Sequence, residues 1–348
     1  MDRKFAKLFA GGAAVALALS SVGGVVAQGG GYTIGFSNPG GVGNGWREEM
    51  ICAAKAQALA SGEVASMNII HRDTDPAGQL EDIRNLIAAG VDAIVLNPSD
   101  PDALNSAIAE ATSSGIPVVS IDAPVTEPSA YNLSNDQETY GRLGAEWLFE
   151  KLGGQGNVFY MRGIAGHPAD TARDVGFKAA LENYPEINII GEVFTNWSQD
   201  EGKQQMLDLI ASGQQIDGVW TSGIDNVIVD AFVESGLPVP PIVGADNAGF
   251  VTQLLTVEGF EGAAVTNPGT VGGAGVKLAL QILNDEAPAE QTVTVDPQIM
   301  ANDNPEGVAA LEAAQRPDLS PTWPVALQIP GWTDYSDDQL IACVGPGE

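Results

Sequence analysis

The chain has 348 residues, and 44% of them are hydrophobic, which is enough to bury substantial cores. A chain of this length suggests about two domains. Its formal net charge is −30, from 45 acidic and 15 basic side chains. Such a surface repels nucleic-acid phosphates and anionic lipids, so we expect no nucleic-acid partner. The acidity fits an exported protein or life in high salt, and a demand for solubility alone would also explain it.

Residues 1–27 have the features of a secretory signal peptide. A basic start, MDRKFAKLF, precedes a short apolar stretch, and Val25 and Ala27 occupy the small-residue positions before a cleavage site. The apolar stretch is too short to span a membrane stably, and no later segment has about 18 uninterrupted apolar residues. We therefore expect export across the inner membrane, to a periplasmic or extracellular location.

From residue 32 onward, short apolar segments alternate with longer amphipathic ones. In chain order the predicted elements are strand 32–38, helix 45–62, strand 64–70, helix 76–90, strand 92–96, helix 101–115, strand 117–122, strand 131–134, helix 137–152, strand 157–161, helix 168–184, strand 187–194, helix 199–212, strand 218–222, helix 225–235, strand 241–245, helix 248–258, strand 262–267 and helix 268–284. Strands that alternate with helices of this length indicate parallel sheets with right-handed crossovers.

The number of strands indicates an α/β fold with two doubly wound parallel-sheet lobes. Ten strand candidates are too many for one ordinary sheet. Ligands of such sheets bind beyond the carboxyl ends of the strands. Several apolar segments end there in a carboxylate, among them those that lead to Asp122, Asp225 and Asp246. Two lobes would aim these groups into one cleft. Each Asp could instead cap the helix that follows it, above all Asp225.

Several motifs are similar to those of a known family. DTDPAGQLEDIRNLIAAGVDAIVLNPSDPDAL followed by GIPVVSID resembles the sugar-binding periplasmic proteins of ABC transporters, in the ribose- and galactofuranose-binding group. GNGWREEM, LSND, TARDVGFKAAL, VGADNAG and VTNPGTVGGAGVKLAL follow the family order over residues 32–300. The resemblance implies the type I periplasmic binding protein fold, in which a three-segment hinge joins two lobes that close on a sugar.

The resemblance also implies the lobe boundaries. We expect an N-terminal lobe of residues 32–132 plus 268–292, a C-terminal lobe of 133–267 plus 293–310, and a C-terminal tail over 311–348 that departs from the family. The tail is rich in proline and is expected to be extended, with one short helical turn near its end.

The matched motifs imply a set of ligand-binding residues. They are Asn44, Trp46, Asp122, Arg173, Trp197, Asp225, Asp246 and Asn267. Carboxylates accept hydrogen bonds from sugar hydroxyls, Arg and Asn donate them, and Trp rings cover the C–H face of a sugar. The alternatives are ordinary partial burial for the two Trp residues and a surface ion pair for Arg173.

The charges of this set predict the class of ligand. Three Asp residues face one Arg, and Ala123 stands where the family usually has a second Arg, which argues against ribose itself. A net negative pocket would favour neutral monosaccharides or polyols, then amino sugars, and disfavour anionic sugars.

The resemblance implies a binding protein rather than an enzyme. It would act as a monomer without a cofactor and deliver a monosaccharide or polyol to a membrane ABC permease. A zinc site is not expected, because His71 and His167 are far apart in a chain without zinc motifs. Two other readings stay open. One is a secreted carbohydrate-active enzyme that uses paired Asp residues. The other is a chemoreceptor adaptor of the same fold, which would share the ligand and differ in its partner.

The chain contains two cysteines, Cys52 and Cys343. In an exported protein an even pair predicts a disulfide. Two buried thiols far apart are the alternative.

Overall fold

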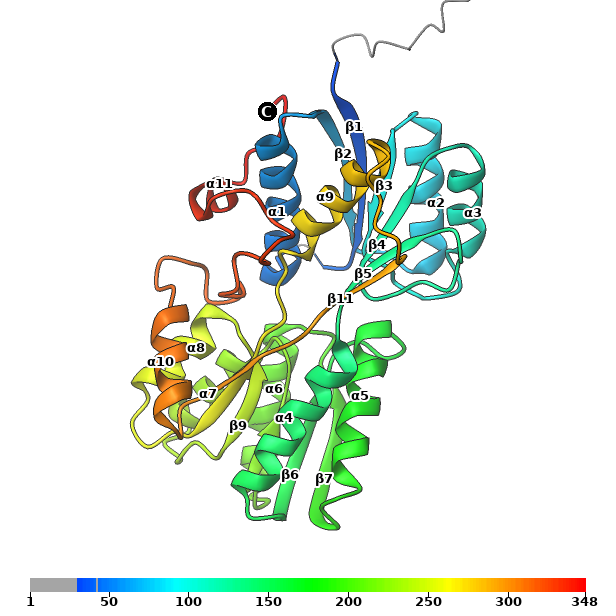
Figure 1. Cartoon of the computed structure of the whole chain (residues 1–348). Coiled ribbons are helices and arrows are strands. Elements are labelled where there is room, and N and C mark those ends of the chain that lie inside the picture. Colours follow the sequence, from blue (N-terminus) through cyan, green and yellow to red (C-terminus); the bar gives the residue numbers. More distant parts are fainter. Residues whose placement is uncertain (1–29, 42) are drawn as a thin grey trace, which may run out of the picture. The chain divides into compact units, whose positions relative to one another are not determined.

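The computed structural model describes residues 30–41 and 43–348. The predicted signal peptide lies outside the described residues. Residues 31–348 form one compact unit, which contains two six-stranded sheets with helices on their faces (Figure 1). No helix in the described part of the chain is long and apolar enough to cross a membrane.

The first sheet is parallel throughout, in the order β11-β5-β4-β3-β1-β2. Its strands are β1 (Tyr32–Pro39), β2 (Val64–Arg72), β3 (Ala93–Leu96), β4 (Val118–Asp122), β5 (Tyr131–Asn135) and β11 (Thr292–Val295). Helices α1 (Gly45–Ser61) and α9 (Val271–Leu283) pack on one face, and α2 (Pro76–Ala88) and α3 (Asn105–Ser113) pack on the other.

The second sheet has the order β12-β10-β9-β8-β6-β7, and only the edge strand β12 is antiparallel to its neighbour. Its strands are β6 (Gln155–Arg162), β7 (Glu186–Phe194), β8 (Gly218–Trp220), β9 (Ile242–Ala245), β10 (Gly262–Val265) and β12 (Ile299–Ala301). One face carries α4 (Gln137–Lys151) and α5 (Pro168–Leu181), and the other carries α6 (Gln199–Ala211), α7 (Asp225–Glu234), α8 (Ala248–Thr256) and α10 (Pro305–Ala314).

Local sequence explains where these elements lie. The central strands β3, β4, β9 and β10 are buried along their whole length and are largely aliphatic, as strands covered on both faces must be. Many helices begin at a side chain that accepts a hydrogen bond from the first turn. Asp75, for example, caps α2 and is followed by Pro76, which suits the first helical position. The predicted two-lobe α/β fold is confirmed.

The chain passes between the two sheets after β5, between β10 and α9, between β11 and β12, and again after α10 (Figure 1). The expected boundary between 132 and 133 falls inside β5, and the one between 292 and 293 falls inside β11. Both strands pair within the first sheet. Since these strands move with their sheet, the boundaries that we propose follow Asn135 and Val295.

The C-terminal tail returns to the first lobe. Beyond α10, which the sequence analysis did not predict, the backbone is irregular until α11 (Asp337–Ala342). Leu327, Tyr335 and Leu340 pack against two alanines of α1. The predicted disulfide is confirmed, because Cys52 of α1 is bonded to Cys343 across 291 residues of sequence.

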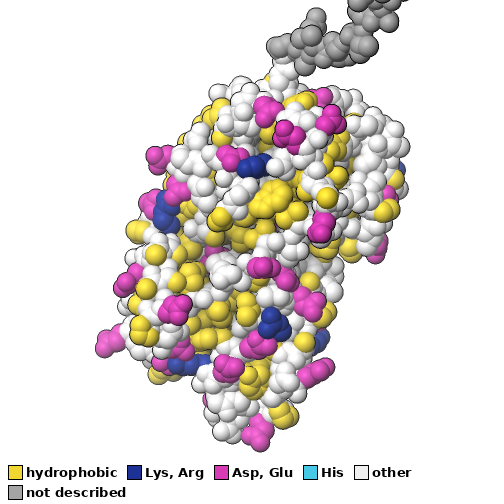
Figure 2. All heavy atoms as spheres, viewed as in Figure 1, with side chains coloured by type: hydrophobic (Ala, Val, Ile, Leu, Met, Phe, Trp, Pro, Cys, Tyr) yellow, Lys and Arg dark blue, Asp and Glu magenta, His cyan; other side chains and the backbone are white. Residues whose placement is uncertain are grey.

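Acidic side chains are scattered over the visible face of the protein rather than gathered in one patch, and Lys and Arg are fewer (Figure 2).

Candidate functional site

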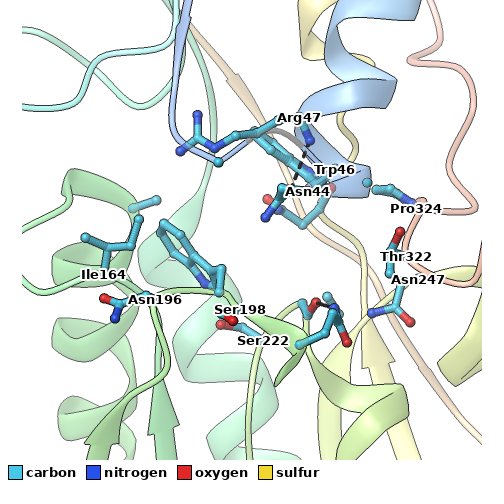
Figure 3. A pocket seen from close by; sticks show the side chains of 18 of the residues that line it. Asn44, Trp46, Arg47, Ile164, Asn196, Ser198, Ser222, Asn247, Thr322 and Pro324 are labelled. Carbon is cyan, nitrogen blue, oxygen red and sulfur yellow. Dashed lines mark hydrogen bonds between the residues drawn. The ribbon is translucent and has the colours of Figure 1, made fainter. Parts of the chain in front are cut away.

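The carboxyl ends of the strands in both sheets meet at a cavity of about 400 Å³ (Figure 3). The first lobe contributes the loop between β1 and α1 and the end of β4. The second lobe contributes the segments that follow β6, β7, β8 and β9, and the tail adds two residues. This is the place where open α/β sheets bind ligands.

Seven of the eight sequence-predicted residues line this cavity. They are Asn44, Trp46, Asp122, Arg173, Trp197, Asp246 and Asn267. The eighth, Asp225, is not among the lining residues. It is the first residue of α7 and fully buried, and its Oδ2 accepts hydrogen bonds from the Gly223 backbone N–H (3.1 Å) and from Asn247 Nδ2 (2.8 Å). Asp225 therefore supports two lining residues from behind, and burial raises its pKa to about 7.

Asp122 is connected to Arg173 in the other lobe. Asp122 ends β4, and its Oδ1 accepts a 2.7 Å hydrogen bond from Gln137 Nε2. Gln137 Oε1 in turn accepts a 2.7 Å hydrogen bond from Arg173 Nε. Burial raises the pKa of Asp122, and Arg173 and Arg47 partly offset that rise. The three side chains thus hold an acceptor and a cation at fixed places across the cleft.

The Arg173 guanidinium is fixed by its surroundings as well as by Gln137. It lies 4.2 Å from the ring centre of Tyr140 and 5.9 Å from that of Trp197, both within cation–π range. Its Nη2 is 3.1 Å from the side-chain amide of Asn267. Although it is a helix residue, it is only 5% exposed, so it is not the surface ion pair that was the alternative.

Arg47 is a second buried cation at the cavity, and the sequence analysis missed it. It is 4% exposed, and its Nη1 donates to Asn38 Oδ1 at 2.9 Å. Burial lowers its pKa to about 10, so it stays charged at neutral pH. Its position in the sequence could have indicated a role in the site. A cation in the first turn of a helix is disfavoured by the helix dipole, so other interactions have to hold it there.

This second Arg corrects the charge prediction. Asp122 and Asp246 are the buried acids that line the cavity, and Arg47 and Arg173 are the buried cations. Asp200 also lines it but is exposed. The buried charges are therefore balanced rather than net negative, because Asp225 stands behind the wall and Arg47 stands in it.

One carboxylate oxygen of Asp246, Oδ2, accepts no hydrogen bond from the described residues, and we call it the open oxygen. The other oxygen, Oδ1, accepts a 2.9 Å hydrogen bond from the Asn267 backbone N–H, whereas the open oxygen is buried without such a partner. Burial raises the pKa of this carboxyl to about 6. A buried carboxylate oxygen without a donor is costly, so this atom is suited to a ligand that brings one.

Two tryptophans form apolar walls. Trp46 Nε1 donates to the Asn267 backbone carbonyl at 2.7 Å, which ties α1 to the passage between the lobes. The Trp197 ring meets the His167 ring edge-on at 4.9 Å and 85°. His167 is buried, and burial holds its pKa well below its usual range, so the ring is neutral. Neither Trp is simply a core residue, because both line the cavity.

Part of the cavity wall has a strained backbone. Asp122, Asn196 and Trp197 have φ values of 69°, 53° and 50°, in the left-handed region that non-glycine residues seldom adopt. Such conformations tend to occur where function requires a fixed side-chain direction.

Sequence reasoning also missed residues that tertiary contacts bring in. Arg47, His167, Asn247, Thr322 and Pro324 all line the cavity. Figure 3 shows Thr322 and Pro324 entering it from the C-terminal tail, near Asn247. Among residues 30–41 and 43–348, no group of three or more His, Cys, Asp or Glu side chains could hold a metal ion.

Residues 34–287 match the family model of the periplasmic binding protein domain. Among curated proteins, the xylitol-binding protein of Mycolicibacterium smegmatis is 30% identical over 65% of this chain, and the chain spans 66% of that relative. The galactofuranose-binding protein YtfQ of Escherichia coli is 30% identical over 59% of this chain and 67% of its own length.

Solved structures share the fold. An ABC transporter solute-binding protein from Mycobacterium smegmatis, with bound glycerol, superposes with a TM-score of 0.74 at 22% identity, over 84% of this chain and 99% of that one. A second such protein, from Thermobispora bispora, gives a TM-score of 0.71 at 23% identity, over the same shares of the two chains. Since the family model covers most of the sequence and the fold agrees, this chain belongs to the periplasmic binding protein family.

Proposed function

We propose that this protein is an extracytoplasmic solute-binding protein that captures a neutral monosaccharide or polyol and delivers it to an ABC permease. The observation that carries the proposal is the cavity between the two lobes, where the open Asp246 Oδ2 lies among buried Asp and Arg side chains and two tryptophans. The family supports it, and so do the names of two curated relatives, a xylitol-binding protein and a galactofuranose-binding protein.

The preference for a neutral ligand rests on hydrogen bonding. A hydroxyl both donates and accepts, so one ligand can satisfy Asp246 and Asp122 as acceptors and Arg47 and Arg173 as donors. A sugar acid or sugar phosphate also carries hydroxyls, but it adds an anionic group to a cavity whose buried charges are already balanced, beside the Asp122 and Asp246 carboxyls. We therefore rank neutral sugars and polyols first, amino sugars second and anionic sugars last.

The comparison with curated relatives supports binding without turnover. The curated relatives are binding proteins rather than enzymes. Here the buried carboxyl of Asp122 is engaged by Gln137, and that of Asp246 by the backbone of Asn267. We infer that they position the ligand, and that the protein acts as a monomer outside the inner membrane. A chemoreceptor that recognises the ligand-bound protein is a further proposed partner.

A thermal-shift screen of pentoses, hexoses, polyols, amino sugars and sugar acids tests the proposal. A ligand that binds only the folded protein stabilises it by about 2.7 kcal/mol at 100 times its Kd. We expect at least one neutral compound to raise the melting temperature and to be recovered unchanged. If none does, the proposal is wrong, and release of a product would favour the carbohydrate-active enzyme.

A further inference from the structure

Residues 320–327 of the tail, which we call the strap, run past the cavity from the second lobe to the first (Figure 1). They follow α10, which packs on the second sheet, and they precede the segment that packs on α1. The strap is thus the fourth passage of the chain between the lobes, in addition to the three hinge segments that were expected.

The strap is joined to the second lobe at the N-terminus of α8. The backbone N–H groups of Ala248 and Gly249, the first two residues of α8, donate to the carbonyls of Trp323 (2.8 Å) and Pro321 (2.9 Å). The backbone N–H of Val325 donates to the carbonyl of Asp246 at 2.9 Å. First-turn N–H groups have no partner within their own helix, so the strap carbonyls satisfy donors that would otherwise face the cavity or water.

The strap is joined to the first lobe at both ends of its path. Gly45, the first residue of α1, lies so close to Thr322 that a Cβ there would overlap the Thr322 hydroxyl and the Thr322 backbone carbonyl. Thr270, which precedes α9, donates from Oγ1 to the carbonyl of Ala326 at 3.2 Å. Leu327 is buried against α1.

The tail beyond the strap is anchored more firmly. Gln57 of α1 exchanges two 2.9 Å hydrogen bonds with Asp334, and Lys277 of α9 pairs with the same carboxylate at 2.8 Å. The bond between Cys52 and Cys343 then makes the return to α1 covalent.

We propose that the strap is a wall of the ligand site and that Thr322 is a specificity-determining contact for the ligand. Thr322 and Pro324 line the cavity, so the strap offers one hydroxyl and one apolar ring at the same edge. The Thr322 hydroxyl lies 3.2 Å from Ser320 Oγ, which leaves it further hydrogen-bonding capacity for a ligand hydroxyl. This inference rests on the proposed function and adds the tail to the site.

The proposal makes the disulfide a support for the wall of the binding site. Because the strap touches α8 on one side and α1 on the other, its position depends on where the tail is attached. The Cys52–Cys343 bond fixes that attachment, so losing it should loosen the strap at Ala248 and Gly249 and weaken ligand binding. The protein would then bind its ligand best in an oxidising compartment.

Two substitutions at Thr322 test the contact, using the neutral ligand that the screen of the wild-type protein identifies. Thr322→Val keeps the shape and removes the hydroxyl, so we expect affinity to fall about fivefold to tenfold, the value of one hydrogen bond. Thr322→Tyr fills the cavity edge and should abolish measurable binding. The matched control is Thr256→Tyr, at the exposed C-terminal end of α8, which should bind like the wild type.

A second measurement needs no ligand. In the Cys52→Ser, Cys343→Ser double variant, amide exchange followed by NMR should be at least tenfold faster at Ala248 and Gly249 than in the wild type. The amide of Thr139, which Asp136 caps at the start of α4, is the internal control and should not change.

These experiments separate the two proposals. If the wild type binds no ligand, the proposed function fails, and the exchange measurement still decides whether the disulfide holds the strap. If the wild type binds and both Thr322 variants bind equally well, the strap is not part of the site. Unchanged exchange at Ala248 and Gly249 in the double variant would overturn the role given to the disulfide.

Discussion

At the scale of single residues, the cavity holds its charges in a connected set. Asp122, Gln137 and Arg173 form a chain of hydrogen bonds across the cleft, and Arg47 is held by Asn38. Asp246 differs, because one of its oxygens has no partner in the described part of the chain. Charge-assisted hydrogen bonds are the strong ones, so the open oxygen is where a ligand hydroxyl gains most.

Ligand binding should therefore depend on pH through Asp246. The carboxylate accepts a ligand hydroxyl, and its pKa is raised to about 6, so affinity should weaken as pH falls through about 6. Asp246→Asn should cost roughly tenfold or more in affinity at pH 8 and remove this dependence. Calorimetry between pH 5 and 8 measures both. Asp225, whose pKa is about 7, also titrates in this range. Asp225→Asn is therefore the control, and its ligand affinity should still weaken at low pH. Equal pH profiles for wild type and Asp246→Asn would contradict the prediction.

Glu49 predicts a pH dependence of stability. It is fully buried without an ion pair among the described residues, and burial together with Asp246 raises its pKa well above the usual range. The folded state keeps the proton after the unfolded state has lost it. Its contribution to the free energy of unfolding is therefore complete at pH 4 and decreases as pH rises, by about 1.4 kcal/mol per unit until the raised pKa is reached.

Urea unfolding of Glu49→Gln and wild type at pH 5 and pH 7 tests this. We expect the stability of the wild type to fall relative to that of Glu49→Gln as pH rises. The two proteins are compared by how their free energy of unfolding changes with pH. Their values at a single pH are not compared, because the buried amide of Gln changes the stability by itself. Parallel pH profiles would show that Glu49 does not titrate abnormally.

At the scale of elements, the N-terminus of α8 joins several parts of the site. Asn247 caps α8 by accepting from the Phe250 N–H at 3.1 Å, and its Nδ2 donates to Asp225 at 2.8 Å. The strap carbonyls accept hydrogen bonds from the N–H groups of Ala248 and Gly249. One helix end thus positions Asp246, Asn247 and the strap together.

Asn247→Ala should be more costly than an ordinary loss of a helix cap. Losing a cap destabilises by about 1 kcal/mol, and leaving Asp225 without its buried donor adds about 1–3 kcal/mol. Ser198→Ala, which removes the cap of α6, is the matched control, because it should show only the destabilisation from losing a helix cap. Denaturant unfolding without ligand compares them, and equal losses would show that the bond between Asn247 and Asp225 contributes nothing.

The sequence predicted those elements whose signal is local. Buried aliphatic strands and capped amphipathic helices have short-range patterns, so the alternation up to α9 agreed with the structure. Helix α10 was missed, although Asn304 as a cap and Pro305 at the first helical position signalled its start. The edge strands β11 and β12 were missed too, because three or four residues carry too little pattern.

The site was predicted in part, for a different reason. Asp122 and Asp246 follow buried strands, so their place at the cleft follows from the fold. Arg47 and His167 could not be placed in that way, because burial and direction depend on how α1 and α5 pack. Thr322 and Pro324 reach the cavity only because the tail is attached to α1, which no local pattern encodes.

At the scale of the whole molecule, two lobes with separate cores share one cavity and four chain passages. Closing on a ligand would require the passages to absorb the change in backbone angles while the cores stay intact. The strap and its disulfide add a connection that limits how the lobes can separate.

Ligand should therefore make the protein more compact. We expect the radius of gyration from solution scattering to decrease when the neutral ligand identified by the screen is added. The Thr322→Tyr variant, which should not bind, is the control and should give the same profile with and without that ligand. Identical wild-type profiles in both conditions would contradict closure.

The most direct test of the central claim, capture of a neutral sugar or polyol without turnover, is titration calorimetry of the wild type. The panel contains xylitol, ribose, xylose, glucose, glucosamine and glucuronate, and each compound is analysed afterwards for chemical change. We predict the tightest binding for a neutral compound, weaker binding for glucosamine, the weakest for glucuronate, and full recovery of every compound. Tightest binding of glucuronate, or consumption of any sugar, would contradict this account.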